Sequence, residues 1–160
     1  MRKFSIAFFA LLVLLFAGMT GYVALSKDFT EPSSGLSQEE YGITEDSPIW
    51  SLTIDDLAQY LYDKGMLKTL DYLPLSGGIA TEARQYGDLD LYWWDVENLE
   101  EGSAEEKAYE EMSESGMIDL WGSGNMMSLT RQGPFGLWTT NYTGDLNELL
   151  DAYHAFGTEK

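Results

Sequence analysis

The sequence predicts an α+β domain in which a small antiparallel sheet of two hairpins packs against three helices in two layers. Apolar and polar residues alternate from Asp88 to Val96, which is typical of a strand with one buried face. The clearest helical repeat consists of Leu146, Leu149, Leu150, Tyr153 and Phe156. Glycine-containing turns separate these segments. The expected order is helix, hairpin, helix, hairpin, helix, with helices lying on the sheet.

Three helices are predicted from their caps. Each is preceded by a residue whose side-chain oxygen can accept from a free backbone N–H, and each is followed by a glycine. The predicted caps are Thr53, Ser103 and Asp145, and the predicted stops are Gly65, Gly116 and Gly157. The alanines of the second helix indicate close packing against a sheet.

Two hairpins supply the predicted sheet. The first joins residues 79–86 to residues 89–96 through a two-residue turn that contains glycine. The second joins residues 126–130 to residues 135–142 through 131–134. Strands that are connected by tight turns pair antiparallel, and the strand at 89–96 is expected to be central.

Length and composition limit the classes of protein. A chain of 160 residues has room for one domain, and its net charge of −18 disfavours nucleic acid as a partner because both would be negative. Aromatic residues make up 14% of the chain, which is too many for a disordered acidic tail. No cysteine is present, so disulfides, thiolate metal sites and cysteine nucleophiles are excluded.

Three segments follow from the distribution of charge. Residues 1–26 are predicted to be an N-terminal membrane anchor or signal peptide, and residues 27–48, rich in Ser, Gly, Pro and acidic residues, a flexible acidic linker. Residues 49–160 are expected to form a single extracytoplasmic α+β domain.

The N-terminal segment allows two interpretations. Residues 4–26 are uncharged and long enough to cross a membrane, and the basic Arg2 and Lys3 place the amino terminus inside. The chain would then be a single-pass protein of the cell membrane with its domain outside. Alternatively, cleavage before Lys27 would release a secreted protein.

The predicted ligand-binding residues are Tyr92, Trp94, Asp88 and Asp90. In a strand, these side chains share the face opposite to Leu89, Leu91 and Trp93. Aromatic rings bordered by carboxylates can stack on a sugar ring or hold a cation. The alternative is that the rings pack under a helix.

Catalytic groups are scarce. His154 is the single histidine, and although Asp151 lies one turn before it, no nucleophile motif or phosphate-binding loop accompanies the pair. We predict no catalytic residues, no cofactor and no metal site. A glycoside hydrolase would need two carboxylates across a cleft, which could come from Asp88, Asp90 or Asp95.

These observations favour a non-enzymatic extracytoplasmic binding or interaction module of a bacterial cell surface, with a protein or a glycan as its ligand. Two alternatives remain open. The first is a small hydrolase of envelope glycans that uses a carboxylate pair, and the second is an accessory subunit of a membrane complex.

Overall fold

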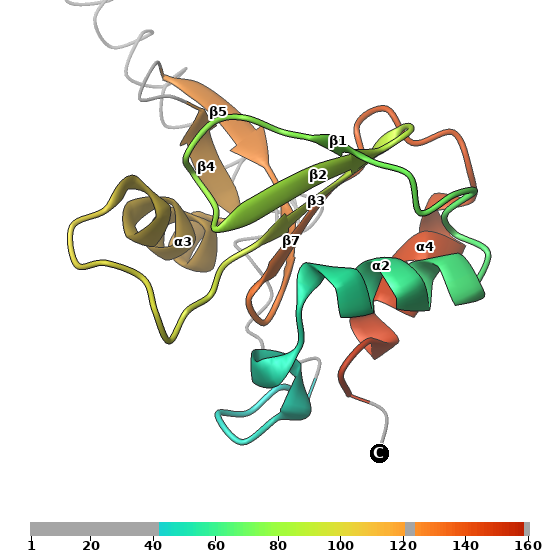
Figure 1. Ribbon diagram of the computed structural model, residues 1–160, viewed down its shortest axis with the longest axis horizontal. Helices are drawn as coiled ribbons and strands as arrows, with labels where there is room; N and C mark the ends of the chain where they lie inside the picture. Colours follow the sequence, from blue (N-terminus) through green and yellow to red (C-terminus); the bar gives the residue numbers. More distant parts are fainter. Residues whose placement is uncertain (1–41, 121–123, 159–160) are drawn as a thin grey trace, which may run out of the picture. The chain divides into compact units, whose positions relative to one another are not determined.

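The computed structural model describes residues 42–120 and 124–158, and it confirms the predicted α+β class (Figure 1). The helices of this part are the short 3-10 helix η2 (Pro48–Ser51), α2 (Ile54–Asp63), α3 (Ala104–Ser115) and α4 (Leu146–Ala155). Its strands are β1 (Leu73–Pro74), β2 (Glu82–Tyr86), β3 (Leu89–Trp93), β4 (Met117–Leu120), β5 (Asn125–Ser128), β6 (Thr130–Gln132) and β7 (Phe135–Trp138).

The main sheet is antiparallel and has the strand order β1-β2-β3-β7-β6. Strand β3 lies in its centre, as the alternating pattern predicts. The β2–β3 hairpin closes at the pair of Tyr86 and Leu89, so that Gly87 and Asp88 form the turn. Gly87 has a φ of +66°, a conformation that this kind of tight hairpin turn requires.

The second hairpin differs from its prediction. Strand β5 pairs with β4, in the register Ile118↔Met127, and these two strands form a separate sheet. The partner of β7 is instead β6, which overlaps the predicted turn at 131–134. Gln132 of β6 is fully buried, and its side-chain amide donates to carbonyl oxygens at the end of α4.

Gln132 links the sheet to the end of α4. Its Nε2 donates to the carbonyl oxygens of His154 (2.7 Å) and Phe156 (3.0 Å), and its Oε1 lies 2.9 Å from Nδ1 of His154. Burial lowers the pKa of the half-buried His154, and the charge of Asp151 opposes this effect. The single histidine therefore makes a structural contact between α4 and β6.

The helix caps follow the sequence closely. Thr53 accepts from the backbone N–H of Asp56, and the Asp56 carboxylate accepts from the backbone N–H of Thr53 (2.8 Å), which completes a capping box. The side-chain oxygen of Ser103 accepts from the backbone N–H of Glu106 at the start of α3, and that of Asp145 accepts from Asn147 and Glu148 at the start of α4. Local sequence therefore sets where these helices begin.

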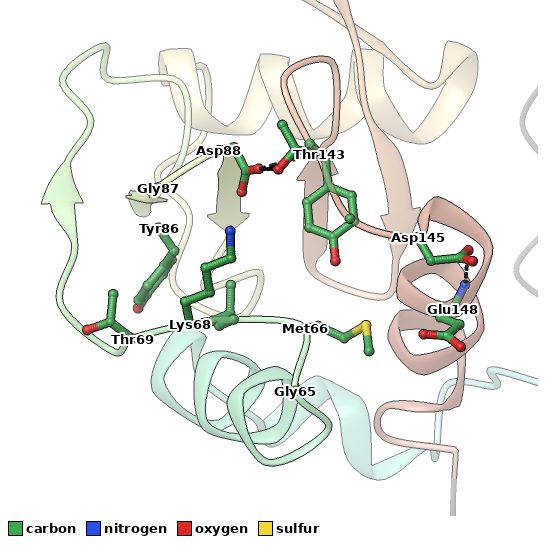
Figure 2. Close-up of a pocket in the computed structure, with 13 residues that line it drawn as sticks. Gly65, Met66, Lys68, Thr69, Tyr86, Gly87, Asp88, Thr143, Asp145 and Glu148 are labelled. Atoms are coloured by element: carbon green, nitrogen blue, oxygen red, sulfur yellow. Dashed lines mark hydrogen bonds between the residues drawn. The ribbon is translucent and has the colours of Figure 1, made fainter.

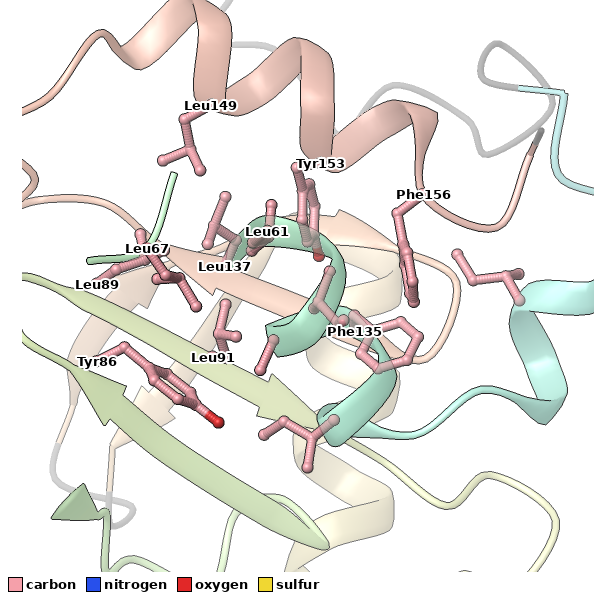
Figure 3. Packing of buried hydrophobic residues seen from close by; sticks show 14 of the residues in the cluster. Leu61, Leu67, Tyr86, Leu89, Leu91, Phe135, Leu137, Leu149, Tyr153 and Phe156 are labelled. Carbon is pink, nitrogen blue, oxygen red and sulfur yellow. The ribbon is translucent and has the colours of Figure 1, made fainter. Parts of the chain in front are cut away.

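The first face of the sheet is covered by α2 and α4 (Figures 1 and 3). Leu89 and Leu91 of β3 are fully buried there. They share a core with Leu57 of α2 and Tyr153 of α4, which are also fully buried. Large apolar side chains from both helices fill this layer, as the helical repeats predict.

The second face is covered as well, by α3 and the β4–β5 hairpin. Trp94 and Tyr92 share this core with Met112 of α3 and Ile118 of β4. The sheet therefore has a layer on each face, whereas the sequence predicted two layers in all. The additional layer consists of α3 and strands β4 and β5, which pack on the second face.

The predicted N-terminal segment, residues 1–26, lies outside the described residues, as does most of the predicted linker, residues 27–48. Ile43 and Ile49 are buried in the first core, so ordered packing begins before residue 49. None of the helices in the described part of the chain has the length and apolar character needed to cross a membrane.

Candidate functional site

A cavity of about 350 Å³ opens where three loops meet on the sheet (Figure 2). The loops are residues 65–69 after α2, the β2–β3 turn, and residues 142–145 between β7 and α4. We call this cavity the Asp88 cleft. Its polar and aromatic lining consists of Lys68, Thr69, Tyr86, Asp88, Tyr142, Thr143, Asp145 and Glu148.

Asp88 is held in one orientation by Thr143. Its Oδ2 accepts from the Thr143 hydroxyl (2.6 Å) and from the Thr143 backbone N–H (2.9 Å). These two bonds lower the pKa of Asp88, the hydroxyl most strongly, and the positive charge of Lys68 adds to the effect. The ammonium group of Lys68 points toward Asp88 (Figure 2). The cleft therefore contains a fixed carboxylate that is ionised at neutral pH.

The cleft carries an excess of negative charge. Burial raises the pKa of Tyr142, and the carboxylates of Asp88, Asp145 and Glu148 raise it further. The lining of the cleft therefore contains three carboxylates and one lysine. A cation, or a group with several hydroxyl donors, suits such a lining better than an anion does.

Gly144 allows the Tyr142 ring to lie close to the loop. A Cβ atom at position 144 would collide with the phenol of Tyr142. The ring would have to move, although the obstacle is the far end of a flexible side chain. The absence of a side chain at Gly144 therefore leaves the space that the phenol ring of Tyr142 occupies.

The other three predicted site residues are buried. Trp94 has no exposed surface, and its indole N–H donates to the carbonyl oxygen of Ile79 (2.8 Å). Tyr92 is 6% exposed and Asp90 is 4% exposed. Burial raises the pKa of Asp90, and a hydrogen bond from Gln85 opposes this effect. The expected exposed face of aromatic rings and carboxylates does not form.

The burial has a plain physical cause. Helix α3 places Ala108 and Met112 on the second face, and Ile118 of β4 is fully buried beside them. Covering Trp94 removes a large apolar area from water, which stabilises the fold. The small residues of α3 predicted this contact with a sheet, but not which strand would be covered.

The carboxylates proposed for a hydrolase lie apart. Asp88 is in the β2–β3 turn, whereas Asp95 follows the other end of β3 and its carboxylate accepts from Asn98. Asp90 lies between them and is buried. In the described part of the chain, no group of three or more acidic or histidine side chains is placed to hold a metal ion.

Sequence reasoning missed Lys68, Tyr142 and Thr143. The contact between Asp88 and Thr143 joins residues 55 positions apart, and neither the charge pattern nor the periodicity indicates it. Thr143 could be recognised only as part of the polar segment before the α4 cap.

No protein-family model matches this chain, no curated protein is similar to it in sequence, and no solved structure matches its fold.

Proposed function

We propose that this protein is a non-enzymatic extracytoplasmic binding module of a bacterial cell surface, and that the Asp88 cleft holds its ligand. The observation that carries the proposal is the carboxylate of Asp88, fixed by two hydrogen bonds from Thr143 at a cavity of about 350 Å³. A carboxylate that is already oriented loses little freedom on binding, so it can contribute to affinity.

The lining indicates the chemistry of the ligand. Three carboxylates favour a positively charged group, while the partly exposed ring of Tyr142 can pack against the flat face of a sugar. The ammonium group of Lys68 adds a donor for hydroxyl or carbonyl oxygens. A glycan that carries amino groups satisfies all of these contacts, and a lysine-rich protein segment satisfies the first.

The cellular location rests on the N-terminal sequence. Residues 4–26 are uncharged and follow two basic residues, so the domain is expected outside the membrane, either anchored or secreted. Protease treatment of intact cells that express the chain with a C-terminal tag should remove the tag. Its survival until lysis would place the domain inside. The mass of the mature protein distinguishes an anchored chain from one cleaved before Lys27.

Binding can be measured by calorimetry with the full-length chain and three probes: a glucosamine tetramer, its N-acetylated form and tetralysine. The glucosamine tetramer should bind more tightly than its acetylated form, and added salt should weaken it. Tighter binding of tetralysine would indicate a protein ligand. Equal binding of the two tetramers would exclude recognition of the amine.

The test of the site is Asp88→Asn, which keeps an oxygen that can accept from Thr143 but removes the charge. We expect its affinity for the glucosamine tetramer to fall at least five-fold. The matched control is Glu110→Gln, which removes an exposed carboxylate from α3. Equal losses in the two variants would indicate attraction by overall charge and would refute the Asp88 cleft as the binding site.

A further inference from the structure

A second cavity, of about 220 Å³, lies on the opposite face of the sheet, and the proposed function does not use it. It opens between the loop that joins β1 to β2 and strands β3, β5 and β7. We call it the Tyr92 pocket. The side chains that enclose it are Leu75, Ile79, Ala83, Tyr92, Met127 and Trp138. This lining is almost entirely apolar, and it shares no residue with the Asp88 cleft.

The hydroxyl of Tyr92 is a buried polar group of this lining that lacks a good partner. The ring is 6% exposed, and the hydroxyl donates to the thioether sulfur of Met127 across 3.9 Å. Sulfur is a weak acceptor, whereas buried phenols usually donate to oxygen or nitrogen. Burial, together with the charge of Asp90, raises the pKa of Tyr92 to about 12. The hydroxyl therefore keeps its proton at neutral pH and remains a donor.

The rim of the pocket leaves the entrance open. Gly77 and Gly78 form part of it, and a Cβ on Gly78 would meet no atom within 4 Å. Two positions without side chains on the loop allow a small molecule to approach the apolar walls. Met127 and Trp138, on separate strands, form the sides and serve as built-in reporters of binding.

We infer that the Tyr92 pocket binds a small, neutral ring compound that carries one acceptor oxygen, with the oxygen accepting from the Tyr92 hydroxyl. The size follows from the volume, since a dry cavity of about 150 Å³ holds benzene. Anions are repelled by the buried Asp90 close to Tyr92 and by the net charge of −18. A cation is disfavoured because the apolar lining cannot replace its hydration, so the ligand should be neutral. The acceptor follows from the poorly partnered donor.

Methyl NMR tests this inference on the full-length chain, labelled with ¹³C at its methionine methyl groups. The Met127 signal is assigned with Met127→Leu. Acetophenone, a ring with a carbonyl acceptor, should shift that signal to saturation. Ethylbenzene has a similar size but no oxygen, and it should bind more weakly. Equal affinities would refute the hydrogen bond, and no shift with either compound would refute the pocket.

Tyr92→Phe removes the hydroxyl and keeps the ring. Acetophenone should then bind about five-fold more weakly, which is the effect of one hydrogen bond, while ethylbenzene is unaffected. The matched control is Tyr60→Phe, because the Tyr60 hydroxyl is buried without a partner among the described residues and lies outside the pocket. Ala83→Leu fills the pocket and should abolish both shifts. If Tyr92→Phe binds acetophenone as the unaltered chain does, the inference is wrong.

Discussion

The two faces of strand β3 differ in how completely they are packed. On the first face, Leu89 and Leu91 meet large apolar side chains from α2 and α4 in a continuous core. On the second face, a cavity remains beside Tyr92, and Asp90 is buried. Both faces are removed from water, and the buried polar residues of the first, Arg84 and Gln132, bond to residues of α2 and of the end of α4.

Side chains on the second face are tightly packed in some places. A Cβ on Gly136 of β7 would lie 3.0 Å from Leu129 Cδ1 and 3.2 Å from Trp94 Cζ3, so the layers are already in close contact there. The hollow lies instead at Ala83, beside the loop before β2. Incomplete packing is therefore local, which is the usual arrangement around a binding pocket.

Truncation of a buried side chain on each face tests this difference most strongly. Leu91→Ala should lower the free energy of unfolding by about 3–5 kcal/mol, because Leu91 is fully buried in the central strand. Met127→Ala should lower it by only about 2 kcal/mol, because part of the Met127 side chain already borders a cavity. Urea denaturation measures both values. Equal losses would contradict the proposed difference in packing.

Replacement of Asp90 tests how much the buried carboxylate destabilises the second face. Asp90→Asn should raise the free energy of unfolding at pH 7 by about 1 kcal/mol, because a neutral amide is less costly to bury than a charge. The folded-state pKa of Asp90 is raised, so the ionised group destabilises the fold above that pKa. The gain should shrink as pH falls toward the ordinary pKa of aspartate. A loss of stability at pH 7 would show that Asp90 is favourably paired.

The smallest effect is expected at Asp88, two residues before Asp90 in the sequence. Its pKa is lowered by the fold, whereas that of Asp90 is raised. Thr143→Val removes one donor, so the pKa of Asp88 should rise toward its ordinary value, as NMR titration of the carboxyl carbon would show. Because the folded pKa is lowered, the bond stabilises the fold above the ordinary pKa and is lost as pH falls through the lowered value. The cost at pH 7 should be about 0.5 kcal/mol, given solvent screening. Thr140→Val, at an exposed threonine of the same loop, serves as the control.

Much of the fold was predictable because local interactions decide it. The caps at Thr53 and Asp145, and the β2–β3 turn at Gly87, form within a few residues and match their predictions. The second hairpin was not predictable in this way. Residues 125–128 pair with β4, and the strand that pairs with β7 contains Gln132, whose hydrogen-bond partners lie 22 and 24 residues further along the sequence.

The candidate site was predictable only in part. Asp88 lines the Asp88 cleft and Tyr92 lines the Tyr92 pocket, while Asp90 and Trp94 are buried and line neither. Alternation along β3 assigned side chains to two faces, but a strand pattern contains no information about which layers cover each face. The residues that complete the Asp88 cleft come from loops far away in the sequence.

The sequence by itself determined the α+β class, the start of each helix and the central place of β3, because caps, turns and periodicity act over short distances. Only the tertiary structure decided that both faces of β3 are covered, that Asp88 meets Thr143, and that a cavity remains beside Tyr92. These features depend on how distant segments fill the space between the layers, and packing of this kind is set by the whole chain at once.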